Sequence, residues 1–119
     1  GVTCGEVYAK AAAYIAGQGY EKSWVMEHIG YGVGIRQSEF YPIISKDSPT
    51  ILRENMVVDL LLPTIFIPGA GGPRITDTIL IGKRGVEFLT EFPADPMPGK
   101  AALCNLSTQE TTVYKEEYL

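Results

Sequence analysis

The sequence has few of the residues that build metal sites and disulfide frameworks. It contains one histidine, His28, and two cysteines, Cys4 and Cys104, at opposite ends of the chain. A single pair of cysteines does not make a disulfide framework, and no secretory signal is present, so we expect reduced thiols in the cytosol or nucleus. These residues also fall short of the four clustered ligands of a structural zinc site.

Basic runs and long apolar runs are also missing. Ten Lys and Arg are scattered among 14 Asp and Glu, for a net charge of −4. No stretch is basic enough to follow a phosphate backbone, which argues against direct nucleic-acid binding. No apolar run approaches the length of a membrane span. The 119 residues, 45% of them apolar, suffice for one domain with a modest core. Because the chain starts at Gly1 without Met, we expect a piece of a longer protein.

The clearest local signal is a helix over residues 3–16. Thr3 is a suitable N-cap, and Glu6 three positions later completes a capping box. Apolar residues recur at helical spacing on one stripe: Val7, Ala11, Tyr14 and Ile15. Gly17 and Gly19 end the helix. Residues 20–28 indicate at most a short second helical turn.

After residue 30 the pattern is typical of strands. We expect extended segments at 39–45, with Pro42 confining that segment to an edge, and at 55–67, the most apolar run. Residues 74–90 alternate around a turn at 83–85 and predict a β-hairpin. Asp77 lies on its apolar face and needs a partner if buried. Residues 93–119 form a loop-rich tail, in which "TTVY" could add a strand.

The fold class is therefore α+β, with one or two helices and an antiparallel sheet. One helix cannot cover both faces of such a sheet. Either the other face is solvated, or the missing part of a larger domain covers it. We take residues 1–119 as a single partial domain.

The glycine-rich segment "IGYGVGIRQSEF" at 29–40 raises the question of a ligand site. A dinucleotide fingerprint needs a strand before its glycines and a helix after them, and the order here is inverted. A strand closely approached by a ligand or by another backbone remains open, with the structural reading favoured. His28 has no recognisable catalytic partner. The basic trio Arg36, Lys83 and Arg84 is better explained as a solvated face than as an anion site.

Several motifs together resemble the second half of the pita-bread fold of methionine aminopeptidases, creatinase and prolidases. They are "GVTCGEVYAKAAAYIAGQG", "IGYGVGI" and "NMVVDLLLPTIFIPGAGGPRITDTILIGKRGVEFLT", and they cover residues 1–92. The resemblance implies a site for two metal ions held by two Asp, one His and two Glu. The two Asp belong to strands upstream of Gly1.

At the positions of the metal ligands, this chain differs from the family motifs. The His of G-H-G falls on Tyr31, and a second family His falls on Ser38. The Glu of T-I-E-P falls on Leu61 or Leu62, depending on the residue from which it is counted, and the Glu of R-I-E-D-T falls on Thr76. A phenol, an alkyl chain and a hydroxyl do not hold a divalent ion as imidazole and carboxylates do. We therefore expect no metal, no cofactor and no catalytic residue in this segment.

A pita-bread domain without its ligands is similar to the N-terminal peptidase-like domain of the large subunit of FACT, a histone chaperone complex. This resemblance implies a nuclear, non-catalytic domain that acts in transcription and DNA replication. It would bind histones or other peptide segments, alongside the other FACT subunit. The isolated fragment could form a dimer through exposed sheet surface. The alternative is a diverged metallo-aminopeptidase or creatinase-type hydrolase.

Overall fold

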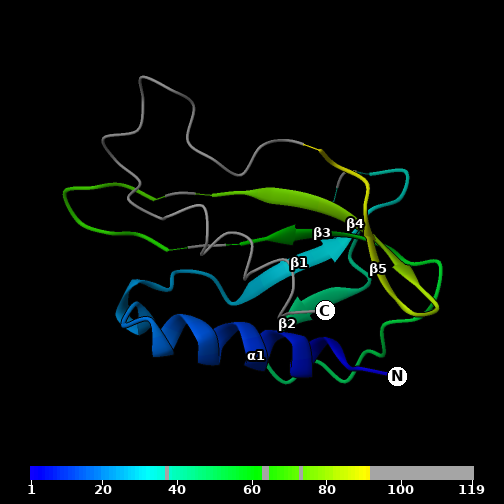
Figure 1. Cartoon of the computed structure of the whole chain (residues 1–119), viewed down its shortest axis with the longest axis horizontal. Helices are drawn as coiled ribbons and strands as arrows, with labels where there is room; N and C mark the ends of the chain where they lie inside the picture. Colours follow the sequence, from blue (N-terminus) through cyan, green and yellow to red (C-terminus); the bar gives the residue numbers. More distant parts are fainter. Residues whose placement is uncertain (37, 63–64, 73, 92–119) are drawn as a thin grey trace.

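The computed structural model describes residues 1–36, 38–62, 65–72 and 74–91. One helix precedes a five-stranded antiparallel sheet with strand order β2-β1-β3-β4-β5 (Figure 1). The elements are α1 (Cys4–Gly17), the 3₁₀ turn η1 (Glu21–Ser23), β1 (His28–Gly32), β2 (Ile43–Ser45), β3 (Val57–Leu61), β4 (Thr76–Gly82) and β5 (Gly85–Phe88). The predicted α+β fold class with an antiparallel sheet is confirmed.

Helix α1 begins with the predicted capping box. The Thr3 hydroxyl accepts a hydrogen bond from the Glu6 amide at 3.2 Å, and the Glu6 carboxylate accepts one from the Thr3 amide at 2.7 Å. Two donors that the first helical turn leaves unpaired are thus satisfied locally. Hydrogen bonds from Thr3 lower the pKa of the Glu6 carboxyl group. The bond from the Thr3 backbone has the larger effect, and the bond from its hydroxyl has the smaller one.

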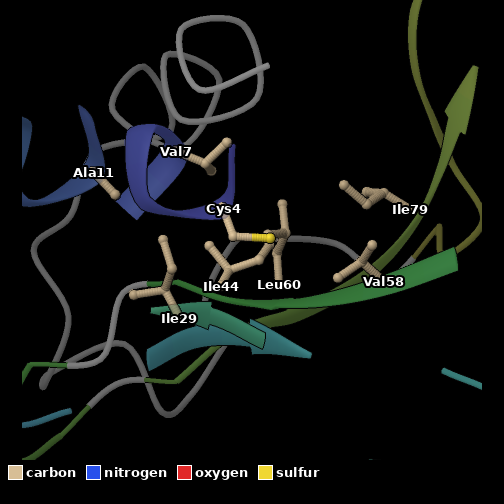
Figure 2. Close-up of a cluster of buried hydrophobic side chains, with 8 residues drawn as sticks. All are labelled: Cys4, Val7, Ala11, Ile29, Ile44, Val58, Leu60 and Ile79. Carbon is tan, nitrogen blue, oxygen red and sulfur yellow. The ribbon is translucent and has the colours of Figure 1, made fainter. Parts of the chain in front are cut away.

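The core lies between α1 and one face of the sheet. Figure 2 shows Cys4, Val7 and Ala11 of the helix pointing toward side chains of the strands. The strand residues of this cluster are Ile29, Ile44, Val58, Leu60 and Ile79. Cys4 is fully buried, and this burial raises the pKa of its thiol. We call the face that packs on α1 the helix face and the opposite one the open face.

Two segments are shorter than the sequence indicates. The apolar run at 55–67 predicts one long strand, but β3 ends at Leu61. The possible second helix over 20–28 is a single 3₁₀ turn, η1. The short strand β2 follows Pro42 at the sheet edge, as predicted. The expected loop-rich tail at 93–119, with its possible strand, lies outside the described residues.

Strands β4 and β5 form the predicted hairpin. Gly82 pairs with Gly85, so Lys83 and Arg84 make the turn. Asp77 is half-buried and does have a partner, because the Thr90 hydroxyl donates a hydrogen bond to its carboxylate at 2.9 Å. The same hydroxyl accepts from the Thr78 amide at 3.2 Å. These bonds tie the end of the hairpin to β4.

Candidate functional site on the open face

The open face is defined by the alternation of side chains along β3. Val58 and Leu60 belong to the core under α1, so Asp59 and Leu61 point to the other side of the sheet. Directly paired residues share a face. Tyr31 of β1 pairs with Asp59, and Thr78 of β4 pairs with Asp59 from the other side. Ile43 of the edge strand β2 pairs with Tyr31. A row of four side chains therefore crosses the open face.

Three of the positions predicted as former metal ligands meet on this face. Leu61 and Thr76 are direct cross-strand partners. Tyr31 lies in the neighbouring row, where it pairs with Asp59. Leu61 is fully buried, whereas Thr76 is exposed. The alternative position, Leu62, packs against the helix-face core and does not share this face. The fold thus brings together residues from three strands that are separated in the sequence.

Ser38, the remaining predicted position, lies beside this group rather than within it. It is exposed after β1 and lines a shallow hollow of about 220 Å³. The other residues around the hollow are His28, Tyr31, Glu39, Phe40 and Ile43. His28 stands at the start of β1, with its ring centre 6.4 Å from that of Tyr31. Aromatic and aliphatic side chains dominate this hollow, and Tyr31 joins it to the open-face row.

Sequence reasoning missed the most distinctive residue of the open face. Asp59 is the one buried charged residue of the described chain, with 6% of its surface exposed. The Thr78 hydroxyl donates a hydrogen bond of 2.5 Å to its Oδ1 atom. Asp59 interrupts an otherwise apolar run, "MVVDLLL", and this interruption was the available signal. A carboxylate retained inside such a run needs a compensating partner.

The glycines of β1 prove to be sites of close backbone approach. A Cβ atom on Gly30 would stand 2.6 Å from the carbonyl oxygen of Asp59. A Cβ on Gly32 would overlap the carbonyl oxygen of Tyr41 and lie 2.7 Å from Cδ of Pro42. Neighbouring strands and loops, rather than a ligand, therefore require glycine here.

The donor atoms of the open face do not fit a divalent metal pair. Among the residues that the structure describes, no three His, Cys, Asp or Glu side chains gather closely enough to hold a metal ion. The face offers one carboxylate, a phenol and two threonine hydroxyls, where hard or borderline metal ions need several carboxylate or imidazole ligands. None of the helices in this part of the chain is long and apolar enough to cross a membrane.

Comparisons with known proteins identify the family. The family model described as metallopeptidase family M24 matches residues 1–83, and the chain therefore belongs to this family. An Xaa-Pro dipeptidase of Pyrococcus horikoshii is 42% identical over 91 residues, which are 76% of this chain and 25% of that protein. The chain thus spans about a quarter of the length of this relative.

Solved structures agree with this assignment. The prolidase from Pyrococcus horikoshii superposes with a TM-score of 0.71 at 41% identity, covering 78% of this chain and 26% of that one. An Xaa-Pro dipeptidase from Bacillus anthracis superposes with a TM-score of 0.73 at 35% identity, covering 80% of this chain and 26% of that one. The fold is an M24 pita-bread-like fragment, as the motifs indicated.

The same comparisons overturn the FACT-based expectations. The resemblance to the FACT subunit is wrong, and with it the histone-chaperone function and the roles in chromatin, because the similar proteins are Xaa-Pro dipeptidases. The expected nuclear localisation is wrong, since these relatives come from prokaryotes, which have no nucleus. The expectation of a non-enzyme is also wrong, because relatives this similar are enzymes.

Proposed function

We propose that this chain is part of the catalytic domain of an M24 hydrolase that cleaves small peptides of the Xaa-Pro type. The observation that carries the proposal is the 42% identity to an Xaa-Pro dipeptidase over 76% of the chain. Because a shared fold does not by itself imply a shared function, the assignment also depends on the residues of the site. The open face, with Tyr31, Asp59, Thr76 and Thr78, is the surface that we assign to the substrate.

We also propose that this segment contributes no ligand to a metal pair. Tyr31, Leu61 and Thr76 would occupy ligand positions without carrying ligand side chains, and Ser38 would occupy the second histidine position. What this segment would supply is substrate binding: a row of polar groups on a rigid sheet, beside an apolar hollow.

The test is hydrolysis by the full-length protein that contains this chain. Purified protein is incubated with Xaa-Pro dipeptides and with matched Xaa-Ala dipeptides, with and without added Mn²⁺, Co²⁺ or Zn²⁺, and released amino acids are quantified. We expect cleavage of the Xaa-Pro substrates. Equal cleavage of Xaa-Ala would make the protein a general dipeptidase. If folded protein hydrolyses neither set under any of these conditions, the proposed function is rejected.

A matched pair of variants tests the assignment of the open face. Tyr31→Phe removes a hydroxyl from the row beside Asp59. Tyr41→Phe removes a hydroxyl from a side chain that is 60% exposed and outside that row. We expect Tyr31→Phe to lower kcat/KM for the preferred dipeptide and Tyr41→Phe to leave it unchanged. Equal activity of the two variants would place the substrate on another surface.

A further inference from the structure

Asp59 is a buried carboxylate whose charge is not balanced within the described chain. Its side chain is 6% exposed, and its hydrogen-bond partner is the neutral hydroxyl of Thr78, which contacts Oδ1. In the part of the chain that the structure describes, no Lys, Arg or His forms an ion pair with it. The second oxygen, Oδ2, has no hydrogen bond from these residues. Burial of a carboxylate in this state is costly unless a cationic group binds to it.

The surroundings of Asp59 suit an organic cation better than a metal ion. Tyr31, directly opposite, carries a hydroxyl that can accept a hydrogen bond and a ring whose face attracts cations. A protonated amine has three N–H donors and needs several acceptors of this kind. A divalent metal ion would need further carboxylate or imidazole ligands, and the described residues do not provide them.

The hollow beside Tyr31 could hold the apolar part of a ligand that carries an ammonium group. It measures about 220 Å³, and Phe40 and Ile43 contribute apolar walls. Ile43 pairs with Tyr31, which pairs with Asp59, so the hollow and the carboxylate lie along one row of the sheet. Asp59 itself does not line the hollow, and Tyr31 stands between the two, so a ligand in the hollow would have to extend its ammonium group past Tyr31 to reach the carboxylate.

We propose that Asp59 binds the protonated α-amino group of the substrate, with the side chain of the amino-terminal residue in the hollow beside Tyr31. Thr78 acts as a positioning residue, because its hydrogen bond to Oδ1 leaves Oδ2 to face the ammonium group. The proposal rests on the proposed function for its substrate class. Substrate recognition then depends on a direct ion pair between Asp59 and the ammonium group of the substrate.

Binding is measured separately from hydrolysis. The full-length protein is titrated calorimetrically with a slowly cleaved Xaa-Pro dipeptide that has an apolar first residue, and with its N-acetylated analogue, which carries no positive charge. We expect the free amine to bind about 10- to 100-fold more tightly, as for a charge-assisted hydrogen bond. Asp59→Asn, which keeps an acceptor for Thr78, reduces this preference to about threefold or less. The control Glu54→Gln removes an exposed carboxylate before β3 and retains the full preference.

A second measurement separates a binding role from a structural one. If the role of Asp59 is to bind the ligand, Asp59→Asn removes an uncompensated charge from the unliganded protein. The midpoint of urea unfolding of the variant should then equal or exceed that of the wild type. A lower midpoint with an unchanged preference for the free amine would make Asp59 a purely structural residue and overturn the proposal.

Two further outcomes are decisive. If metal analysis finds a stoichiometric divalent ion that Asp59→Asn loses, Asp59 is a metal ligand and the proposal fails. If the wild type binds the acetylated and free dipeptides equally but cleaves Xaa-Pro bonds, the proposal fails while the proposed function stands. Selective binding of the free amine without hydrolysis would support the proposal and reject the function.

Discussion

Replacement of Gly30 by alanine tests whether the glycine-rich strand is required by backbone packing. The added Cβ would stand 2.6 Å from the carbonyl oxygen of Asp59 and 3.0 Å from Cδ1 of Ile44. The isoleucine methyl can move away by rotation, but the carbonyl belongs to the centre of β3. Since carbon–oxygen contacts between strands are normally about 3.3–3.6 Å, β1 and β3 must separate by about 0.7 Å.

The expected cost follows from this separation. Overpacking of a well-packed interior destabilises by about 1–3 kcal/mol, and weakening of a cross-strand hydrogen bond adds about 1 kcal/mol. We therefore expect Gly30→Ala to lower the free energy of unfolding by about 2–4 kcal/mol. For a unit that unfolds with a urea m-value of about 2 kcal/mol/M, the midpoint would fall by about 1–2 M, and a larger unit with a higher m-value would show a proportionally smaller fall.

The matched control is Gly17→Ala at the end of α1. A Cβ there has no atom within 4 Å, and its backbone does not need a positive φ. Alanine favours helix over glycine by about 1 kcal/mol, so the midpoint should stay the same or rise. Both variants are unfolded in urea within the full-length protein and followed by circular dichroism. If Gly30→Ala unfolds at the same urea concentration as Gly17→Ala, backbone approach is not the reason for the glycine.

Three further predictions concern α1 and its cap. Thr3→Ala removes the N-cap hydroxyl and should lower stability by about 1 kcal/mol in urea unfolding, whereas unchanged stability would show that the cap is dispensable. Because folding lowers the pKa of Glu6, the Glu6 carboxylate stabilises the fold above the ordinary pKa of a glutamate, and this stabilisation disappears as the pH falls through the folded pKa. The free energies of unfolding of the wild type and Glu6→Gln should therefore converge in acid. A difference in stability that stays constant from neutral to acidic pH would contradict this. Burial raises the pKa of the Cys4 thiol, so Cys4 should react slowly with a thiolate-directed reagent at neutral pH and rapidly in urea, with labelling read at the peptide that contains Cys4. Equally rapid labelling of Cys4 in the native protein would refute its burial.

Local structure could be predicted where the deciding interactions are close in sequence. The capping box joins Thr3 to Glu6 within one turn, and the alternation of residues 74–82 indicates a strand with two different faces. The need of Asp77 for a partner followed from its place on the apolar face. The end of β3 could not be predicted, since an apolar run is compatible with a longer strand or with a buried connection.

The family could be inferred from the order of the motifs, but the branch and the function were inferred wrongly. Tyr31, Leu61 and Thr76 stand at positions where the resemblance implies ligands, and their replacement favoured a non-catalytic relative. The loss of ligand residues concerns only a few positions of the site, whereas membership of a branch of the family is reflected in sequence similarity along the whole chain. Similarity over about 90 residues therefore outweighs three positions.

The sequence by itself determined the helix with its cap, the hairpin and the α+β class, because periodicity and short-range hydrogen bonds specify them. Only the tertiary structure decided which residues form a site. The register of three antiparallel strands places Tyr31 opposite Asp59 and Asp59 opposite Thr78, although 28 and 19 positions separate these pairs along the chain. It also decided that Gly30 faces a neighbouring backbone rather than a ligand. Strand pairing depends on the packing of the whole sheet on α1, and no short segment of the sequence contains that information.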